Sequence, residues 1–425
     1  MTSINNQCRE SVMPADGTQI GSSKEQPSTE EHATSSADPD NVDWEICDQN
    51  PKNWSLRRKW IMISVVSANT LLTALGATIP APGVPTLMQE FHSDGNLLQS
   101  FVISVYVLGF ALGPLLIAPL SEAYGRQPAY LVGNGGFLIW NIACGFAPNM
   151  ASMMVFRFLA GSFGVAPFAL GGGTIADMVQ PAQRGTAMGI WMAGLTVGPV
   201  IGPTIGGFVS AYLGWRWNFW ILAIMAGTVL LISAIVVKET FAPVLLARKT
   251  KKLQEKTGHS NLQPRLQKNV TARHRLWLSI VRPTKMLFTS LILFLLCLYI
   301  SLVYTIMFIL FTTFTEVFEG QYGFSTAISG LVYLGWGVGS IIGQALYTLW
   351  TNHFVSQRLE KGSFKPEDRL PLMVPGGLLL SLGLIWYGWS AQAQVHWIVP
   401  MIGTAFAAIG LTIVFVSHEL PEKIV

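Results

Sequence analysis

Residues 60–80 read WIMISVVSANTLLTALGATIP, a stretch without a single charged side chain. Arg57, Arg58 and Lys59 precede it directly. About 20 consecutive apolar residues are enough for an α-helix to cross the hydrocarbon core of a bilayer. The stretch therefore predicts a transmembrane helix that begins at a basic, water-facing flank.

Further apolar runs of similar length follow along the chain. They cover roughly 98–120, 128–147, 151–176, 186–211, 216–237, 287–314, 326–350, 371–390 and 396–417. A polar, basic stretch separates the sixth run of the chain, 216–237, from the seventh, 287–314. This layout predicts an all-α membrane protein with a six-helix N-terminal half and a C-terminal half of about four helices. The expected parts are a disordered cytosolic tail (1–54), the first half (55–237), a cytosolic basic loop (238–284) and the second half (285–425).

The composition supports a membrane location. Of the 425 residues, 51% are hydrophobic and only 12% are charged, whereas soluble proteins carry about 25% charged residues. So few polar side chains cannot cover a water-exposed surface, and the apolar excess must face lipid. The net charge of +4 does not argue for nucleic acid. Cys8, Cys47, Cys144 and Cys297 lack the spacing of a disulfide framework or a metal site, so we expect no metal and no cofactor.

The distribution of basic residues predicts the orientation. With the N-terminus in the cytosol, every one of the 27 Lys and Arg residues except Arg157 and Arg216 falls in a cytosolic segment. Cytosolic loops of membrane proteins carry an excess of Lys and Arg. The Asn-x-Ser/Thr sites at Asn53 and Asn269 then lie in the cytosol and should stay unglycosylated.

Residues 113–126, GPLLIAPLSEAYGR, form the most informative motif. We expect a helix that ends in a tight turn at Gly125 and exposes Glu122 and Arg126 at the cytosolic face. The stretch resembles the loop 2–3 signature of the major facilitator superfamily, Gly-x-x-x-Asp-x-x-Gly-Arg-Arg/Lys. Glu122 stands for the acidic residue, Gly125 and Arg126 match, and Ala118 and Gln127 depart from the pattern. The alternative is a charged turn that only solvates a helix end.

Arg157 lies inside the apolar run MMVFRFLAGSFGVAPFALGGGTIAD, residues 153–177. An arginine at a helix centre costs about 2.5–3.5 kcal/mol on insertion scales and usually faces the bundle interior. The run is similar to the fourth-helix motif of drug:proton antiporters in the same superfamily, and the resemblance implicates Arg157 in proton coupling. The alternative is that Arg157 extends to the outer membrane interface.

Residues 194–207, GLTVGPVIGPTIGG, place a glycine at every fourth position. Small residues at this spacing lie on one helix face and let two backbones approach closely, and prolines bend a helix. The pattern resembles the antiporter motif of the fifth helix, which is typical of exporters. Its residues here are Gly194, Gly198, Pro199, Gly202, Pro203, Gly206 and Gly207. The alternative is a generic packing motif.

Together the motifs resemble the fungal branch of twelve-span drug:proton antiporters, over about residues 54 to 416. The resemblance implies a monomeric plasma-membrane exporter of a drug, toxin or secondary metabolite, with the vacuolar membrane as the alternative location. Two halves would rock around a central site and exchange a small-molecule substrate for protons. Family members line that site with the first, fourth, seventh and tenth spans, which here implies Asn69, Thr73, Phe168, Tyr299, Tyr304 and Thr404.

The chain departs from the family in its length, because the apolar runs end with the tenth. The eleventh helix, whose N-terminus is expected to attract Glu122, is not in this sequence. A wrong gene model and a decaying gene are the favoured explanations, ahead of a working ten-span form, so a transport-inactive membrane protein remains an alternative. A polyamine exporter is a second one. We expect no enzyme, because no His-Glu-x-x-His or paired Asp motif occurs in a span.

Overall fold

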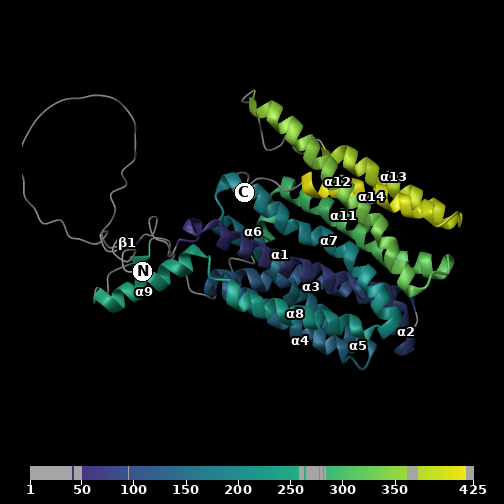
Figure 1. Cartoon of the computed structure of the whole chain (residues 1–425), viewed down its shortest axis with the longest axis horizontal. Coiled ribbons are helices and arrows are strands. Elements are labelled where there is room, and N and C mark those ends of the chain that lie inside the picture. Colours follow the sequence, from purple (N-terminus) through teal and green to yellow (C-terminus); the bar gives the residue numbers. More distant parts are fainter. Residues whose placement is uncertain are drawn as a thin grey trace, which may run out of the picture.

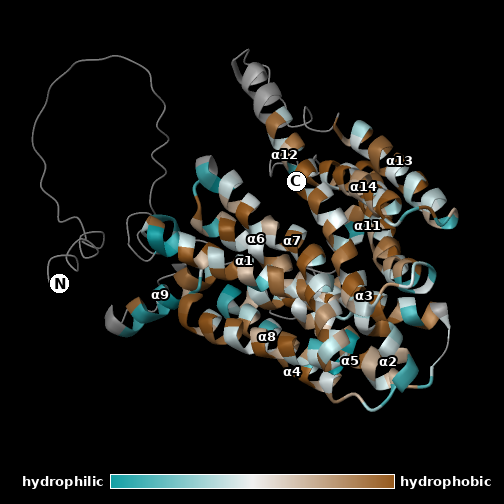
Figure 2. Ribbon diagram, turned by 45° about the vertical axis from the view of Figure 1, so that its right-hand side comes forward, coloured by the Kyte–Doolittle hydropathy of each residue, from teal (hydrophilic) through white to brown (hydrophobic). Residues whose placement is uncertain are grey.

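The computed structural model describes residues 41–42, 50–93, 95–257, 263–264, 277, 281, 284–360 and 372–417, and nearly all of them are helical. The long helices run side by side and form an elongated bundle (Figure 1). Hydrophobic residues cover most of the helix lengths, and α9 and several helix ends are hydrophilic (Figure 2). This is the distribution expected of a protein surrounded by lipid.

The helices fall into two groups along the chain. The first group consists of α1 (Leu56–Thr78), α2 (Val84–Glu90), α3 (Asn96–Tyr124), α4 (Arg126–Gly145), α5 (Met150–Gly164), α6 (Ala166–Met178), α7 (Pro181–Leu213) and α8 (Arg216–Val236). After α9 (Ala242–Thr257), the second group consists of α11 (Leu291–Thr315), α12 (Thr326–Glu360), α13 (Met373–Gln392) and α14 (Ile398–Ser417). Short elements complete the described fold: η1 (Pro51–Asn53), η2 (Ala81–Gly83), the π-helix η3 (Glu316–Gln321), and the paired strands β1 (Asn41–Val42) and β2 (Gln263–Pro264).

Among the described residues, nine helices are long and apolar enough to cross a membrane. They include every predicted apolar run except 128–147, which forms α4. That helix is 20 residues long, but Gln127, Asn134 and Asn141 lower its hydropathy. It packs on α5 and α8 inside the bundle, and we propose that it crosses the membrane with them. The run 151–176 forms two helices, α5 and α6, which meet at Val165.

Glycines let helices of both groups pack backbone to backbone. In the first group, a side chain at Gly109 or Gly113 of α3 would collide with the backbone of Ser162 on α5. In the second, Gly339 and Gly343 of α12 lie in the same way against the backbone of α14. In each pair the two glycines are four residues apart and lie on one helix face. Two structurally similar halves would produce this shared arrangement.

The two groups meet along α7 and α12, with further contacts between α3 and α11. Figure 1 shows α11 to α14 gathered on one side of α7, and α3, α4, α5 and α8 gathered on the other side of α1. The crossing of α7 and α12 is close, because Gly207 and Gly330 face each other there. Thr204 Oγ1 also donates a hydrogen bond to the Gly330 carbonyl oxygen at 3.1 Å.

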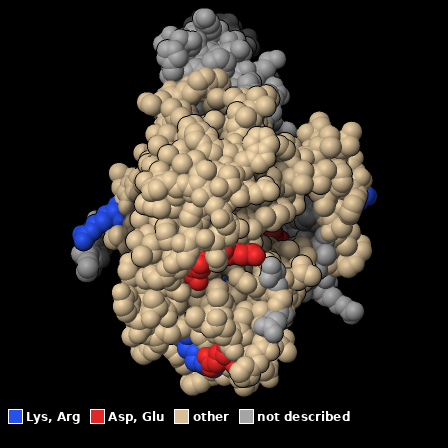
Figure 3. Space-filling view, turned by 90° about the vertical axis from the view of Figure 1, so that its right-hand side faces the viewer, with Lys and Arg blue, Asp and Glu red and all other residues tan. Residues whose placement is uncertain are grey.

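The two ends of the bundle differ in charge. One end, here called the α9 end, carries α9 with Arg248, Lys249, Lys251 and Lys252. Figure 3 shows the opposite end, where the visible described surface carries only small acidic and basic areas. This contrast is what a membrane protein with its basic loops on one side would show.

Candidate functional site

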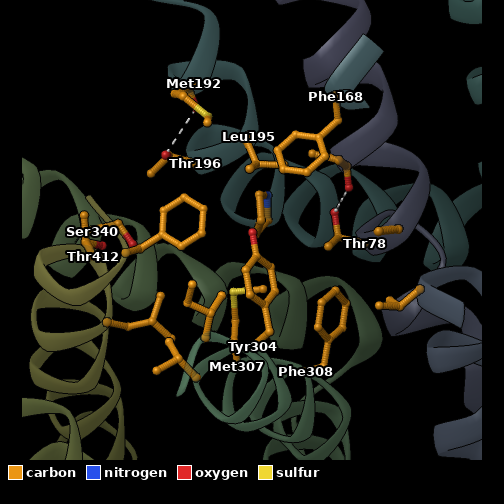
Figure 4. Close-up of a pocket in the computed structure, with 18 of the residues that line it drawn as sticks. Thr78, Phe168, Met192, Leu195, Thr196, Tyr304, Met307, Phe308, Ser340 and Thr412 are labelled. Atoms are coloured by element: carbon orange, nitrogen blue, oxygen red, sulfur yellow. Dashed lines mark hydrogen bonds between the residues drawn. The ribbon is translucent and has the colours of Figure 1, made fainter. Parts of the chain in front are cut away.

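A cavity of about 540 Å³ lies between the two groups of helices. Residues of α1, α3, α6, α7, α11, α12 and α14 line it. Figure 4 shows the side chains that surround the cavity, among them Thr78, Phe168, Met192, Leu195, Thr196, Tyr304, Met307, Phe308, Ser340 and Thr412. A cavity of this size, enclosed by many helices, can hold a small organic molecule.

The cavity wall is apolar and aromatic. No Asp, Glu, Lys, Arg or His occurs among the described residues that line it. The Tyr304 ring lies edge-on to Phe415, with the ring centroids 5.5 Å apart. Thr78 Oγ1 donates to the Ala74 carbonyl oxygen at 3.0 Å, and Thr196 Oγ1 donates to that of Met192 at 3.4 Å. Because these hydroxyl protons point back to the helix, the oxygens can still accept hydrogen bonds from a ligand.

The structure places two of the six expected cavity residues, Phe168 and Tyr304, in the lining. Asn69 instead connects three helices, since it donates to Ser233 Oγ at 3.0 Å and accepts from Asn134 Nδ2 at 2.6 Å. Thr73 Oγ1 donates to the Gly164 carbonyl oxygen at 2.5 Å. These two residues hold α1 against α4, α5 and α8.

Tyr299 and Thr404 also lie outside the cavity lining. Tyr299 packs against the core of the second group, and Thr404 Oγ1 donates to the Met401 carbonyl oxygen at 2.7 Å. The sequence could not separate these positions from Phe168 and Tyr304, because a helix that is apolar on all sides has no periodic pattern to show which face lines a cavity. For the same reason the sequence did not indicate the lining residues of α3, α7 and α12.

Arg157 is buried within the first group and does not line the cavity, with only 1% of its surface exposed. Its Nη1 donates to the Gly76 carbonyl oxygen at 2.9 Å, and its Nε donates to that of Val102 at 3.3 Å. The Gly76 carbonyl is free to accept because its helical partner would be the nitrogen of Pro80, which has no proton. The alternative of an arginine extending to the membrane interface is therefore wrong.

Aromatic rings complete the surroundings of Arg157. Its guanidinium carbon lies 4.9 Å from the ring centre of Tyr106 and 5.9 Å from that of Phe219. The Nη2 atom has no hydrogen-bond partner in the described part of the chain. Carbonyl oxygens and ring faces thus stabilise the buried cation without a carboxylate within 4.0 Å among the described residues.

A charged network connects three helices at the α9 end. Arg126 Nε lies 3.5 Å from Asp177 Oδ2 at the end of α6, and its Nη1 donates to Ser121 Oγ at 3.0 Å. The Glu239 carboxylate, directly after α8, accepts from the backbone nitrogens of Arg126 at 2.8 Å and Gln127 at 3.3 Å. A carboxylate at the first turn of α4 is favourable because the helix N-terminus carries a partial positive charge.

Gly125 makes this network possible. Its φ of +108° suits glycine, and a side chain there would collide with the Glu239 carboxylate. Glu122 lies on the exposed surface nearby. Asp177 and Glu239 were not expected as site residues, since Glu239 is 113 positions from Arg126. The sequence signal for Glu239 was its position two residues after the apolar run 216–237.

The predicted glycine face of α7 packs on α1. A side chain at Gly194 would lie 2.9 Å from the Ser67 carbonyl oxygen, and side chains at Gly198, Gly202 and Gly206 would collide with α1. Gly207 faces α12 instead, because it is one position out of step with the other four. Pro199 lines the cavity. Hence α7 contacts α1, α12 and the cavity at once.

Comparisons with known proteins point to one family. The model of the Major Facilitator Superfamily matches residues 66–424. The chain is 48% identical over 381 residues to the MFS-type transporter penM of Penicillium rubens, which covers 89% of this chain and 75% of penM. It is 41% identical over 417 residues to the efflux pump radE of Floropilus chiversii, which covers 96% of this chain and 77% of radE.

The fold is similar to solved transporter structures. The partially occluded inward open conformation of the xylose transporter XylE from E. coli superimposes with a TM-score of 0.65 and 17% sequence identity, over 85% of this chain and 83% of XylE. A crystal structure of a D-xylose-proton symporter gives a TM-score of 0.62, also at 17% identity, over 84% of this chain and 80% of the symporter. At this identity the likeness concerns the fold alone.

Proposed function

This chain belongs to the Major Facilitator Superfamily and is a multi-pass membrane protein of a family that transports small molecules, and from that premise we propose that it exports uncharged, largely aromatic organic molecules. The observation that carries this proposal is the cavity between the two helix groups. It has aromatic and methionine walls and a few hydroxyl groups, and the described residues that line it carry no formal charge. A drug, a toxin or a secondary metabolite of low charge fits this chemistry.

The direction of transport is proposed from α7. Its glycines and prolines form the motif that resembles the fifth helix of exporters, and the relative radE is named an efflux pump. The substrate would enter from the cytosol and leave on the opposite side. Alternating access would come from the two helix groups rocking around the cavity, with the glycine crossing of α7 and α12 as the contact about which they turn.

We keep proton antiport as the proposed source of energy, with Arg157, Glu122 and Arg126 as coupling or gating residues. Arginines stay protonated in proteins, so the proton must bind elsewhere. We assign it to Asp177, whose side chain is 25% exposed and pairs with Arg126. Protonation would remove the charge that attracts Arg126 and would loosen the contact between α4 and α6 at the α9 end.

The polyamine alternative has less support. A polyamine carries several positive charges, and a buried cation requires carboxylates or other compensating groups. The described part of the chain contributes no carboxylate to the cavity lining. The plasma membrane remains the proposed location, with the vacuolar membrane as the alternative. The α9 end is proposed to face the cytosol, and the protein is proposed to act as a monomer.

Export can be tested in cells that express the chain and are loaded with a panel of neutral aromatic compounds. The wild type should lower the intracellular level of some of them, and Ala111→Trp should not, because Ala111 lines the cavity. Val132→Trp is the matched control, since Val132 is 49% exposed on α4 and does not line the cavity. Equal retention by cells with the wild type and cells without the chain would refute export and favour a transport-inactive protein, whereas export by Ala111→Trp at the wild-type level would overturn the cavity assignment.

Proton coupling needs a separate experiment. Inside-out vesicles should accumulate an exported compound when their interior is acidic, and a protonophore should abolish the accumulation. Accumulation that persists unchanged after the pH gradient collapses would refute antiport but leave export intact.

A further inference from the structure

We propose that Arg157 sets the charge selectivity of the cavity, so that neutral and anionic molecules bind and cations are rejected. This inference rests on the proposed function, since it concerns the same cavity. It assigns Arg157 a role that does not require the residue to exchange a proton or to touch the substrate.

The first observation is an uncompensated buried charge. Arg157 is 1% exposed, and the groups around it are the carbonyl oxygens of Gly76 and Val102 and the rings of Tyr106 and Phe219. These neutral groups stabilise the cation locally. They cannot cancel its field at a distance, because only an opposite full charge does that. In the described part of the chain, no carboxylate lies within 4.0 Å of the guanidinium.

The second observation is the position of this charge directly behind the cavity wall. Gly76, which accepts the hydrogen bond from Arg157, precedes Ala77, and Ala77 lines the cavity. Tyr106, whose ring contacts the guanidinium, precedes Val107, which also lines the cavity. One hydrogen bond and one peptide unit therefore separate the charge from the wall, a distance of about 8 Å.

The third observation is that the lining holds no charge of its own. Among the residues that the structure describes, no Asp, Glu, Lys, Arg or His lines the cavity, so none of them opposes the field of Arg157 at the wall. A unit charge about 8 Å away, at an effective dielectric constant of about 20, changes the affinity of a monovalent ion by roughly 30-fold. A cation is weakened by this factor relative to a neutral molecule, and an anion is strengthened.

The experiment uses the full chain purified in detergent and two probe ions, tetraphenylphosphonium and tetraphenylborate. The two ions have nearly the same size and shape but opposite charge. Binding of each radiolabelled ion is measured on the wild type and on Ala111→Trp, and the part that Ala111→Trp abolishes is counted as cavity binding. The field strengthens one ion about 30-fold and weakens the other about 30-fold, so the wild type should bind the borate roughly 1,000-fold more tightly than the phosphonium.

Two substitutions of Arg157 form a matched pair. Arg157→Gln removes the charge but keeps a side-chain donor for the Gly76 carbonyl, and it should bring the two affinities to within about threefold. Arg157→Lys keeps the charge and should keep the preference for the borate. The preference should not change between pH 6 and pH 8, because neither ion nor the arginine titrates there.

Each outcome bears on the proposal. If the wild type binds both ions equally, the proposal is overturned even if no variant folds. If the Arg157→Gln protein retains the preference for the borate, the proposal is also overturned. Binding of both ions that Ala111→Trp leaves unchanged would show that the cavity is not the binding site, and would overturn the cavity assignment together with this inference. Equal cavity binding of both ions would overturn only the inference.

Discussion

Arg157 Nη1 donates a hydrogen bond to the Gly76 carbonyl oxygen at 2.9 Å, which ties α5 to α1 where Pro80 leaves that carbonyl without a helical donor. Two features of the sequence that lie far apart thus satisfy each other. A proline near the end of one helix creates an unpaired acceptor, and an arginine in another helix supplies the donor. The same bond brings a positive charge close to the cavity.

Arg157→Ala should abolish export and lower the stability of the purified protein. The substitution leaves the buried Gly76 carbonyl unsatisfied, which costs about 1–3 kcal/mol. Thermal unfolding in detergent and the cellular export assay measure the two effects. Full export by Arg157→Ala would remove the residue from the mechanism.

Gly202→Ala should lower the unfolding temperature and the transport rate, because the new methyl group would collide with Thr78 of α1. Gly189→Ala on the same helix is the control, since nothing lies within 4 Å of a side chain there. Removing a glycine from a helix interior at an open site stabilises by about 0.5–1 kcal/mol. If both variants behaved alike, the close packing of α7 on α1 would not be required.

Glu239→Gln should destabilise the α9 end. The charged carboxylate accepts hydrogen bonds from the backbone of α4, and hydrogen bonds to charged groups contribute about 1.5–3 kcal/mol. We expect a lower unfolding temperature than for Glu255→Gln, which alters an exposed carboxylate on α9. Equal unfolding temperatures for the two variants would contradict the assigned role of Glu239 at the start of α4.

Glu90→Gln should have a small effect on stability. Glu90 forms an ion pair with Arg216 and accepts a hydrogen bond from Trp215 Nε1 at 2.7 Å. Both charged side chains are more than a third exposed, and exposed ion pairs contribute about 0–1 kcal/mol. A loss of folded protein in this variant would show that the contact supports the fold more strongly than its exposure suggests.

A glycosylation tag inserted after Ser93 should be modified in cells, whereas Asn53 should not. Ser93 follows α2 at the bundle end opposite α9, and Asn53 lies in η1 before α1. Asn269 lies outside the described residues and has the same expectation as Asn53. A glycosidase-sensitive shift in gel mobility measures the modification. The reverse pattern would mean that the α9 end faces away from the cytosol.

The long helices could be predicted from the sequence because each needs enough apolar residues to cross a bilayer. The run 60–80 forms most of α1 and ends directly before η2. Among the predicted runs, only 128–147 has a mean hydropathy below that of a candidate span. Its buried asparagines lower the value, and asparagines such as Asn134 form hydrogen bonds to other helices and do not face lipid. The glycine face of α7 could also be predicted, because spacing alone places residues on one side of a helix.

The partners of these residues could not be predicted. Which helix the glycines of α7 contact depends on tertiary packing, and so does the choice of Phe168 over Asn69 as a cavity residue. The contact of Glu239 could not be predicted for a similar reason, because a helix cap contributed by a distant segment leaves no local pattern in the sequence. Helix packing decides which residues lie inside a membrane bundle, and a uniformly apolar sequence has no pattern that identifies them.

The most direct test of the proposed alternating access is the accessibility of the cavity from each side of the membrane. Cys8, Cys47, Cys144 and Cys297 are replaced, and Thr412 in the cavity lining becomes the single cysteine. A membrane-impermeant anionic thiosulfonate reagent is then added to right-side-out and to inside-out vesicles. The account predicts labelling of Cys at position 412 from both sides without any ionic current. Labelling from one side only under every condition, or labelling from both sides with a current, would contradict it.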